Sequence, residues 1–170
     1  MDGKYQAPVA ALQERFGVQI SEFRAEVTGV VSAERLVDAV LALRDEFGFD
    51  QLVDLTAVDY WPQETPRFHV VYHIRNLADT LILCLRLPLD GNFPSAPTLE
   101  GVHPGANWYE REVYDMFGVT FTGHSDMRRI LMPADWQGHP LRKDYPLGYE
   151  EVAFSFNVDE IMKRKPHPKE

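Results

Sequence analysis

Five side chains between positions 110 and 126 are of the types that catalyse hydrolysis or bind metal ions: Glu110, Glu112, Asp115, His124 and Asp126. Carboxylates and imidazoles serve as general acids, general bases and metal ligands. The sequence has no Gly-x-Ser-x-Gly elbow, no Gly-x-Gly-x-x-Gly loop and no Walker-type loop to complete an active site around them. A stand-alone metal-dependent hydrolase is therefore the minor alternative for this region.

Two further sets of candidate ligands predict no metal site. His69 and His73 lie four positions apart on one face of a predicted strand, whereas the zinc pattern His-Glu-x-x-His requires a helix and a glutamate after the first histidine. Cys84 is the single cysteine, which excludes a disulfide and any iron–sulfur cluster or zinc site held by several thiolates of this chain. The sequence therefore predicts no catalytic residue, no cofactor-binding residue and no metal ligand.

A short helix over residues 108–117 is predicted, with Asn107 as N-cap, Glu110 at the capping-box position and Gly118 as the stop. One side of this helix faces the domain with Tyr109, Val113, Met116 and Phe117. The opposite side presents Trp108, Arg111, Glu112 and Asp115. A large aromatic residue beside an arginine on an outward face is typical of interface hot spots. A solvated face with an ion pair one turn apart is the plain alternative.

Residues 108–144 are dense in charge, with six acidic and five basic side chains among several aromatic ones. An unpaired buried charge is strongly destabilising. We therefore expect a paired network that fixes one docking geometry. Beyond the short helix only residues 129–133 have a regular pattern, and residues 134–170 have none.

The elements that must position this region predict an α+β fold. The patterns indicate a helix over 9–16, strands over 18–24 and 27–31, a helix between Ser32 and Gly48, and strands over 49–60, 68–75 and 80–87, the last two joined as a hairpin. The order α-β-β-α-β-β-β implies a two-layer mixed sheet with helices on one face. A short helix and an extended irregular C-terminal segment follow it.

Composition sets the class of protein. The chain has 170 residues, of which 45% are hydrophobic, and a formal net charge of −9. This suits one globular body and disfavours nucleic-acid binding, because phosphate backbones repel an acidic protein. The N-terminus has neither a basic region nor an apolar run, so no signal peptide is expected.

A long motif resembles a known family. It consists of Glu-Arg-Glu-Val-Tyr-Asp-Met-Phe-Gly at 110–118, Gly-His at 123–124, Asp126, Arg-Arg-Ile-Leu-Met-Pro at 128–133 and Asp-Trp-Gln-Gly-His-Pro-Leu-Arg-Lys-Asp-Tyr-Pro-Leu at 135–147. These residues resemble the C subunit, or 30 kDa-type subunit, of the proton-pumping NADH:quinone oxidoreductase, respiratory complex I. Ser125 stands where that family usually has proline, and His103 where it often has an aromatic residue. The equivalent subunit of an NDH-type or membrane-bound hydrogenase complex stays open.

The resemblance implies a cofactor-free structural and assembly subunit of the peripheral arm, without catalytic activity of its own. It implies packing chiefly on the D subunit, which holds the quinone site, and proximity to the B and I subunits. The location implied is the cytoplasmic side of the cell membrane, which the chain reaches only through the complex.

The resemblance also divides the chain. Residues 1–105 are the α+β globular domain, residues 106–148 the motif helix and extended partner-binding segment, and residues 149–170 a C-terminal tail. The expected partner interface comprises Trp108, Glu110, Arg111, Glu112, Asp115, His124, Asp126, Arg128, Arg129, His139, Arg142, Lys143 and Asp144. We expect another chain to cover Trp108, and Arg128 and Arg129 to be exposed in the isolated protein.

Overall fold

The computed structural model describes residues 3–91, 93–146, 160 and 163. Its helices are η1 (Gly3–Tyr5), α1 (Gln6–Phe16), α2 (Ala33–Phe47) and α3 (Ala106–Phe117). Its strands are β1 (Gln19–Phe23), β2 (Glu26–Val30), β3 (Gln51–Asp59), β4 (Phe68–Asn76), β5 (Leu81–Leu89), β6 (Ser95–Pro97) and β7 (Thr120–Thr122). The α+β class and the order α-β-β-α-β-β-β are confirmed. The predicted tail, 149–170, lies outside the described residues except for Glu160 and Lys163.

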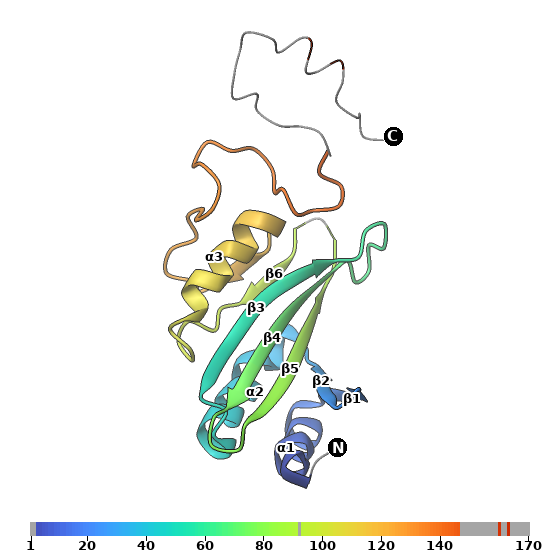
Figure 1. The fold of residues 1–170 in the computed structure, drawn as a ribbon, viewed down its shortest axis with the longest axis vertical. Coiled ribbons are helices and arrows are strands. Elements are labelled where there is room, and N and C mark those ends of the chain that lie inside the picture. The colour runs from blue at the N-terminus through green and yellow to red at the C-terminus, as the bar shows by residue number, and fades with distance from the viewer. Residues whose placement is uncertain (1–2, 92, 147–159, 161–162, 164–170) are drawn as a thin grey trace.

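The five longer strands form one mixed sheet in the order β1-β2-β5-β4-β3 (Figure 1). β2 and β5 pair in parallel, and the other neighbours pair antiparallel. The parallel pair follows from the chain path, because α2 and two further strands separate β2 from β5. The predicted hairpin joins β4 to β5 through the turn at 77–80.

One face of the sheet carries the hydrophobic core. The odd-numbered leucines of β5, from Leu81 to Leu89, are buried in a cluster that includes Leu36, Val40 and Leu43 of α2. In Figure 1, α2 lies behind the sheet and α3 lies beside β3. Successive side chains of a strand point to opposite faces, so leucine at every second position places one face of β5 in the core. Cys84, on the other face of β5, is buried outside this cluster.

The C-terminal part differs from expectation at three points. Residues 90–105, expected to be loop, contain β6, which pairs in parallel with β7; neither three-residue strand was predicted. Residues 129–133, expected to be regular, form no helix or strand. α3 begins at Ala106, so Asn107 is inside the helix and Gly105 takes the N-cap position. Gly118 ends α3 as predicted, with φ of 76°.

Candidate functional site

The motif region begins with α3, which packs along β3. The Tyr109 hydroxyl donates to the Val53 carbonyl of β3 over 3.2 Å. Buried side chains of the same helix, Val113 among them, join the core. The predicted inner side of α3 is thus confirmed, and the helix forms a fixed platform for the segment that follows β7.

Glu110 is fully buried and does not form the predicted capping box. Its Oε1 accepts from the Leu99 N–H over 2.7 Å, and its Oε2 accepts from the Thr98 hydroxyl over 2.5 Å. Burial raises the pKa of this carboxyl, against the opposing effect of the two hydrogen bonds. Glu110 therefore fixes the loop after β6 on α3.

His124 lies beside Glu110, with 3.9 Å between Nε2 and the Glu110 Oε2. The His124 Nδ1 accepts from the Asp126 N–H over 2.9 Å. The proton of the neutral ring is therefore on Nε2, which donates to the Asn107 carbonyl over 3.2 Å. The imidazole thus bridges α3 and the chain after β7, and both of its nitrogens are used in that bridge.

Asp115 organises the next stretch of chain. Its Oδ2 accepts from the backbone N–H groups of residues 130, 131 and 132 over 2.8 to 3.1 Å, and its Oδ1 accepts from Arg129 over 2.6 Å. Burial alone would raise the pKa of this carboxyl, but the three N–H groups and Arg129 outweigh it, and the pKa lies below its ordinary value. The sequence placed Asp115 on an outward face, yet the chain's own residues 129–132 cover it completely.

Arg111 completes that attachment. Its guanidinium donates to the carbonyls of Arg128 and Arg129 over 3.0 and 3.2 Å. The same group lies 5.3 Å from the Trp108 ring centroid, in a cation–π contact. Trp108 itself is 60% exposed, so the expectation that it faces away from the core is confirmed. Its coverage by another chain stays a prediction.

His139 secures the end of the helix. Its Nδ1 lies 3.0 Å from the Asp115 carbonyl, and Arg129 donates to the Gly138 carbonyl over 2.9 Å. A Cβ at Gly118 would come within 2.6 Å of the His139 ring. Glycine at 118 therefore serves two needs, since it allows the positive φ and leaves room for the imidazole.

A third attachment ties the segment to the sheet. Arg67, at the entrance to β4, is fully buried and binds both carboxylate oxygens of Asp59 over 3.0 Å. It also binds Asp144 over 2.9 Å. The Lys143 N–H donates to Asp59 over 2.9 Å. In Figure 1 the segment accordingly runs across the end of the sheet where β3 stops and β4 starts.

Asp144 is itself held by two arginines. Arg142 donates to its Oδ1 over 3.1 Å, and the Arg142 guanidinium lies 5.2 Å from the Phe68 ring centroid. Burial would raise the pKa of the Asp144 carboxyl, but hydrogen bonds from Arg67 and Arg142 lower it to about 2. Sequence reasoning missed Asp59 and Arg67, because neither residue belongs to a motif or has a local pattern that points to its partner.

The predicted interface residues thus fall into two groups. Glu110, Asp115 and the His124 side chain have no exposed surface and act inside the chain. Arg129, expected to be exposed, is 15% exposed because it is paired with Asp115, whereas Arg128 is 83% exposed. Asp126 pairs with Arg128, Glu112 is exposed, and the side chain of Lys143 is exposed.

The hydrolase alternative gains no support from this geometry. Within the described residues, no three of Glu110, Glu112, Asp115, His124 and Asp126 form a group that could hold a metal ion. The polar atoms of Glu110, Asp115, His124 and Asp126 bind backbone groups and neighbouring side chains of the same chain instead, and Glu112 is exposed. Residues 124–146 are thus bound by these contacts to α3 and to the end of the sheet. We name this segment the strap.

Comparison with solved structures defines the class of protein. The fold matches a trypsin-resistant fragment of Nqo5 with a TM-score of 0.63 and 30% identity, over 72% of this chain and 98% of the other. It also matches a chain of the membrane-bound sulfane sulfur reductase, an archaeal respiratory membrane complex, with a TM-score of 0.73 and 25% identity, over 85% and 86% of the two chains. The fold is that of a component of respiratory complexes.

Sequence comparison defines the particular family. Residues 29–151 match the model of the respiratory-chain NADH dehydrogenase 30 kDa subunit. The C subunit of the NADH-quinone oxidoreductase of a Roseiflexus species (strain RS-1) is 52% identical over 88% of this chain and 87% of its own length. The C subunits of Herpetosiphon aurantiacus and Geobacter sulfurreducens are 43% and 45% identical, over 95% and 82% of this chain and 98% and 88% of their own lengths. The chain belongs to the 30 kDa subunit family, the C subunits of complex I.

Proposed function

We propose that this chain is a cofactor-free structural subunit that assembles the peripheral arm of complex I. It docks chiefly on the D subunit, which holds the quinone site, near the B and I subunits, on the cytoplasmic side of the membrane. No helix in the described part of the chain has the length and apolar character needed to cross a bilayer. In this proposal the chain reaches the membrane through its partner subunits.

The observation that carries this proposal is the exposed apolar surface of α3 and the strap. Four large apolar side chains of this region are exposed: Trp108, Ile130, Leu131 and Leu141. Glu110, Asp115 and the His124 side chain are buried in internal bonds, so the apolar side chains are the large uncommitted groups that this region presents to a neighbour, beside the exposed Glu112 and Arg128. Large exposed aromatic and aliphatic side chains on a rigid backbone are the groups that carry binding energy in protein interfaces.

Arg111 links Trp108 of α3 to the part of the strap that carries Ile130 and Leu131. Arg111 contacts the Trp108 ring on one side and the carbonyls of Arg128 and Arg129 on the other. Ile130 and Leu131 follow directly, fixed by their N–H bonds to Asp115. We therefore take Trp108, Ile130 and Leu131, with the exposed Arg128 at their edge, as the centre of the docking surface.

A matched pair of leucines tests the docking surface. Leu131 is 59% exposed on the strap, and Leu77 is 51% exposed on the β4–β5 turn. We expect Leu131→Ala to lower the yield of the assembled complex in native membranes, because it removes apolar contact with the partner. Leu77→Ala should leave that yield unchanged. Both variants should melt within a few degrees of the wild-type protein.

Equal yields for the two variants would refute the docking surface while leaving the family assignment intact. Trp108→Ala extends the test, since loss of a hot-spot tryptophan costs about 2 kcal/mol or more of binding free energy. Co-purification with a tagged D subunit identifies the partner directly. Normal recovery of that partner with Trp108→Ala would place its attachment elsewhere on the chain.

The absence of a cofactor has its own measurement. The sequence has a single cysteine and no nucleotide-binding loop, which supports a subunit without flavin or iron–sulfur cluster. The purified protein should be colourless and should not oxidise NADH with a quinone. Stoichiometric iron, a flavin absorption band or turnover by the isolated protein would refute this part of the proposal.

A further inference from the structure

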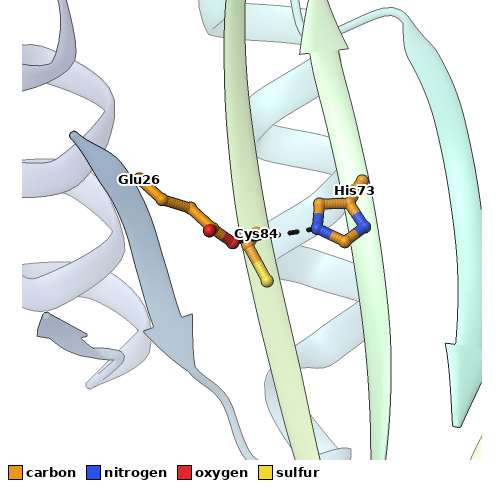
Figure 2. A group of neighbouring side chains, drawn as sticks. All are labelled: Glu26, His73 and Cys84. Atoms are coloured by element: carbon orange, nitrogen blue, oxygen red, sulfur yellow. Dashed lines mark ion pairs between the residues drawn. The ribbon is translucent and has the colours of Figure 1, made fainter. Parts of the chain in front are cut away.

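A second group of reactive side chains lies on the sheet face away from the core. Glu26 of β2, His73 of β4 and Cys84 of β5 bring one ligand atom each to within 4.8 Å of one another. Figure 2 shows the three side chains next to each other across these strands. His73 and Cys84 are directly paired in the register of β4 and β5. Three adjacent strands thus supply an oxygen, a nitrogen and a sulfur to one point.

The spacing is close to that of a tetrahedral zinc site. Zinc bonds of about 2.0–2.3 Å place tetrahedral ligand atoms roughly 3.3–3.6 Å apart. The Glu26 Oε1 lies 3.9 Å from the His73 Nε2. Cys84 is buried and His73 half-buried on two central strands, whereas Glu26 is exposed at the start of β2. Glu26, as the exposed member of the set, is the ligand with the most room to move toward the other two.

Asp54 occupies the position of a supporting residue. Its Oδ2 lies 4.0 Å from the Nδ1 of His73, and the two residues are paired across β3 and β4. Histidine ligands usually give their other ring N–H to a carboxylate, which fixes the tautomer and the ring orientation. A proton on Nδ1, on the side of Asp54, would leave the lone pair of Nε2, on the side of Glu26, free to bind a metal ion.

We propose that Glu26, His73 and Cys84 bind one divalent cation of borderline softness, with zinc as the best match. A nitrogen, a thiolate and a carboxylate are the ligands zinc takes, whereas magnesium and calcium prefer oxygen alone. The thiolate and carboxylate balance the charge of the ion, and the fourth position is left for water. The sequence predicted no metal ligand because spacing along one strand relates His73 only to His69. The other two ligands, Glu26 and Cys84, come from neighbouring strands.

Binding has a defined proton balance. Burial raises the pKa of the Cys84 thiol, so the metal-free chain carries a neutral thiol at pH 7. Zinc displaces that proton to solvent as the sulfur–zinc bond forms. Arg86, on the same face of β5, is held by the Tyr60 hydroxyl, so its guanidinium has a partner outside the three ligands.

Titration of the full-length protein tests the site. The protein is stripped with a chelator and then titrated with zinc against a chromophoric competitor, and separately with cobalt. We expect one equivalent of metal, and with cobalt a thiolate charge-transfer band. His73→Gln and Cys84→Ser should weaken zinc binding by about 100-fold or more. Asp54→Asn should weaken it by about tenfold, the usual loss when a supporting carboxylate is removed.

The control is His69→Gln, which changes the histidine on the same face of the same strand and should bind zinc as the wild type does. Glu26→Gln alters an exposed side chain, so it tests the carboxylate without risk to the fold. X-ray absorption of the zinc-loaded wild type should show one sulfur and the remainder nitrogen and oxygen. A sulfur-free shell, unchanged affinity in His73→Gln and Cys84→Ser, or zinc bound only between two molecules would each overturn the proposal.

Discussion

Asp115 and Arg129 form a 2.6 Å ion pair in which the carboxylate has no exposed surface and the guanidinium is largely covered. The pair joins α3 to a segment without regular secondary structure. The three backbone N–H bonds to the same carboxylate extend that contact over residues 130–132. Asp115 therefore gives the strap a defined shape within the isolated protein, before any partner is present.

Charge reversal should lower the stability of the protein at Arg129 but hardly change it at the adjacent Arg128. Arg129→Glu places a second carboxylate against the buried carboxylate of Asp115. Breaking a buried ion pair costs about 3 kcal/mol or more of stability. We expect its melting temperature to fall by roughly 6–12 °C. Arg128→Glu changes an exposed side chain and should leave the melting temperature close to that of the wild-type protein. Equal melting temperatures for the two variants would show that the Asp115 contact contributes nothing to stability.

Asp115→Asn should loosen the strap without unfolding the body. In the wild type, Oδ2 of Asp115 accepts from the backbone N–H groups of residues 130–132. An NH₂ group at that position cannot accept these bonds, so several hydrogen bonds are lost. We expect amide hydrogen exchange at residues 130–132 to accelerate by about tenfold or more, equivalent to about 1.4 kcal/mol. The amides of β4 and β5 serve as the internal reference. Exchange that rises equally in those strands would mean that Asp115 supports the whole fold instead.

Two arginine–carboxylate pairs allow a comparison of burial. Arg67 is fully buried with Asp59, whereas Arg15 pairs with Glu46 at the surface. Arg67→Met leaves a buried carboxylate without its counter-ion, and we expect a loss of about 3–5 kcal/mol of stability. Arg15→Met should cost much less, because an exposed ion pair contributes little to stability. Urea unfolding of both variants measures the difference, and similar losses would refute the buried network.

Glu110→Gln should change stability in a pH-dependent way. The pKa of Glu110 is raised in the fold, chiefly by burial, so its favourable contribution is present below the unfolded pKa of about 4.3 and is lost as the pH rises through the folded value. Glutamine lacks this titration and can still accept from Leu99 and donate to Thr98. Relative to wild type, the variant should become more stable as the pH rises from about 4 to 7.

Glu100→Gln supplies the control of opposite sign. Hydrogen bonds from the Ser125 hydroxyl and N–H lower the pKa of Glu100. Its contribution is therefore present above the unfolded pKa and lost as the pH falls through the folded value. The two difference curves should slope in opposite directions. If both stability differences changed with pH in the same direction, Glu110 would not be the buried carboxyl with a raised pKa.

The central strands were predictable because burial of one face imposes a period of two on residues 68–75 and 80–87. β6 and β7 were not, since three residues are too short to show any period. Asp115 was misplaced for a different reason. Helical spacing predicts which residues share a side, and a polar side is normally solvated, but here the chain folds back over it. Only long-range contacts such as those of Arg129 reveal the reversal.

The same reason explains the hidden role of Arg67. A single arginine at the entrance to a strand has no local pattern that distinguishes it from a surface residue. Its partners, Asp59 and Asp144, lie on opposite sides of it in the sequence, and the second belongs to a segment with no predicted structure. The sequence identified the family motif that runs through the strap, whereas the bonding partners of its residues in the body required the three-dimensional structure.

The position of Asp59 and Arg67 on either side of one loop also bears on how the protein is made. Both emerge from the ribosome together, well before Asp144, and chains begin to fold from the N-terminal side during synthesis. A nascent body would bury Arg67 already neutralised by Asp59. Completion of the strap then adds Asp144 to an arginine that Asp59 already neutralises. Arg67 therefore need not be buried without a counter-ion while translation continues.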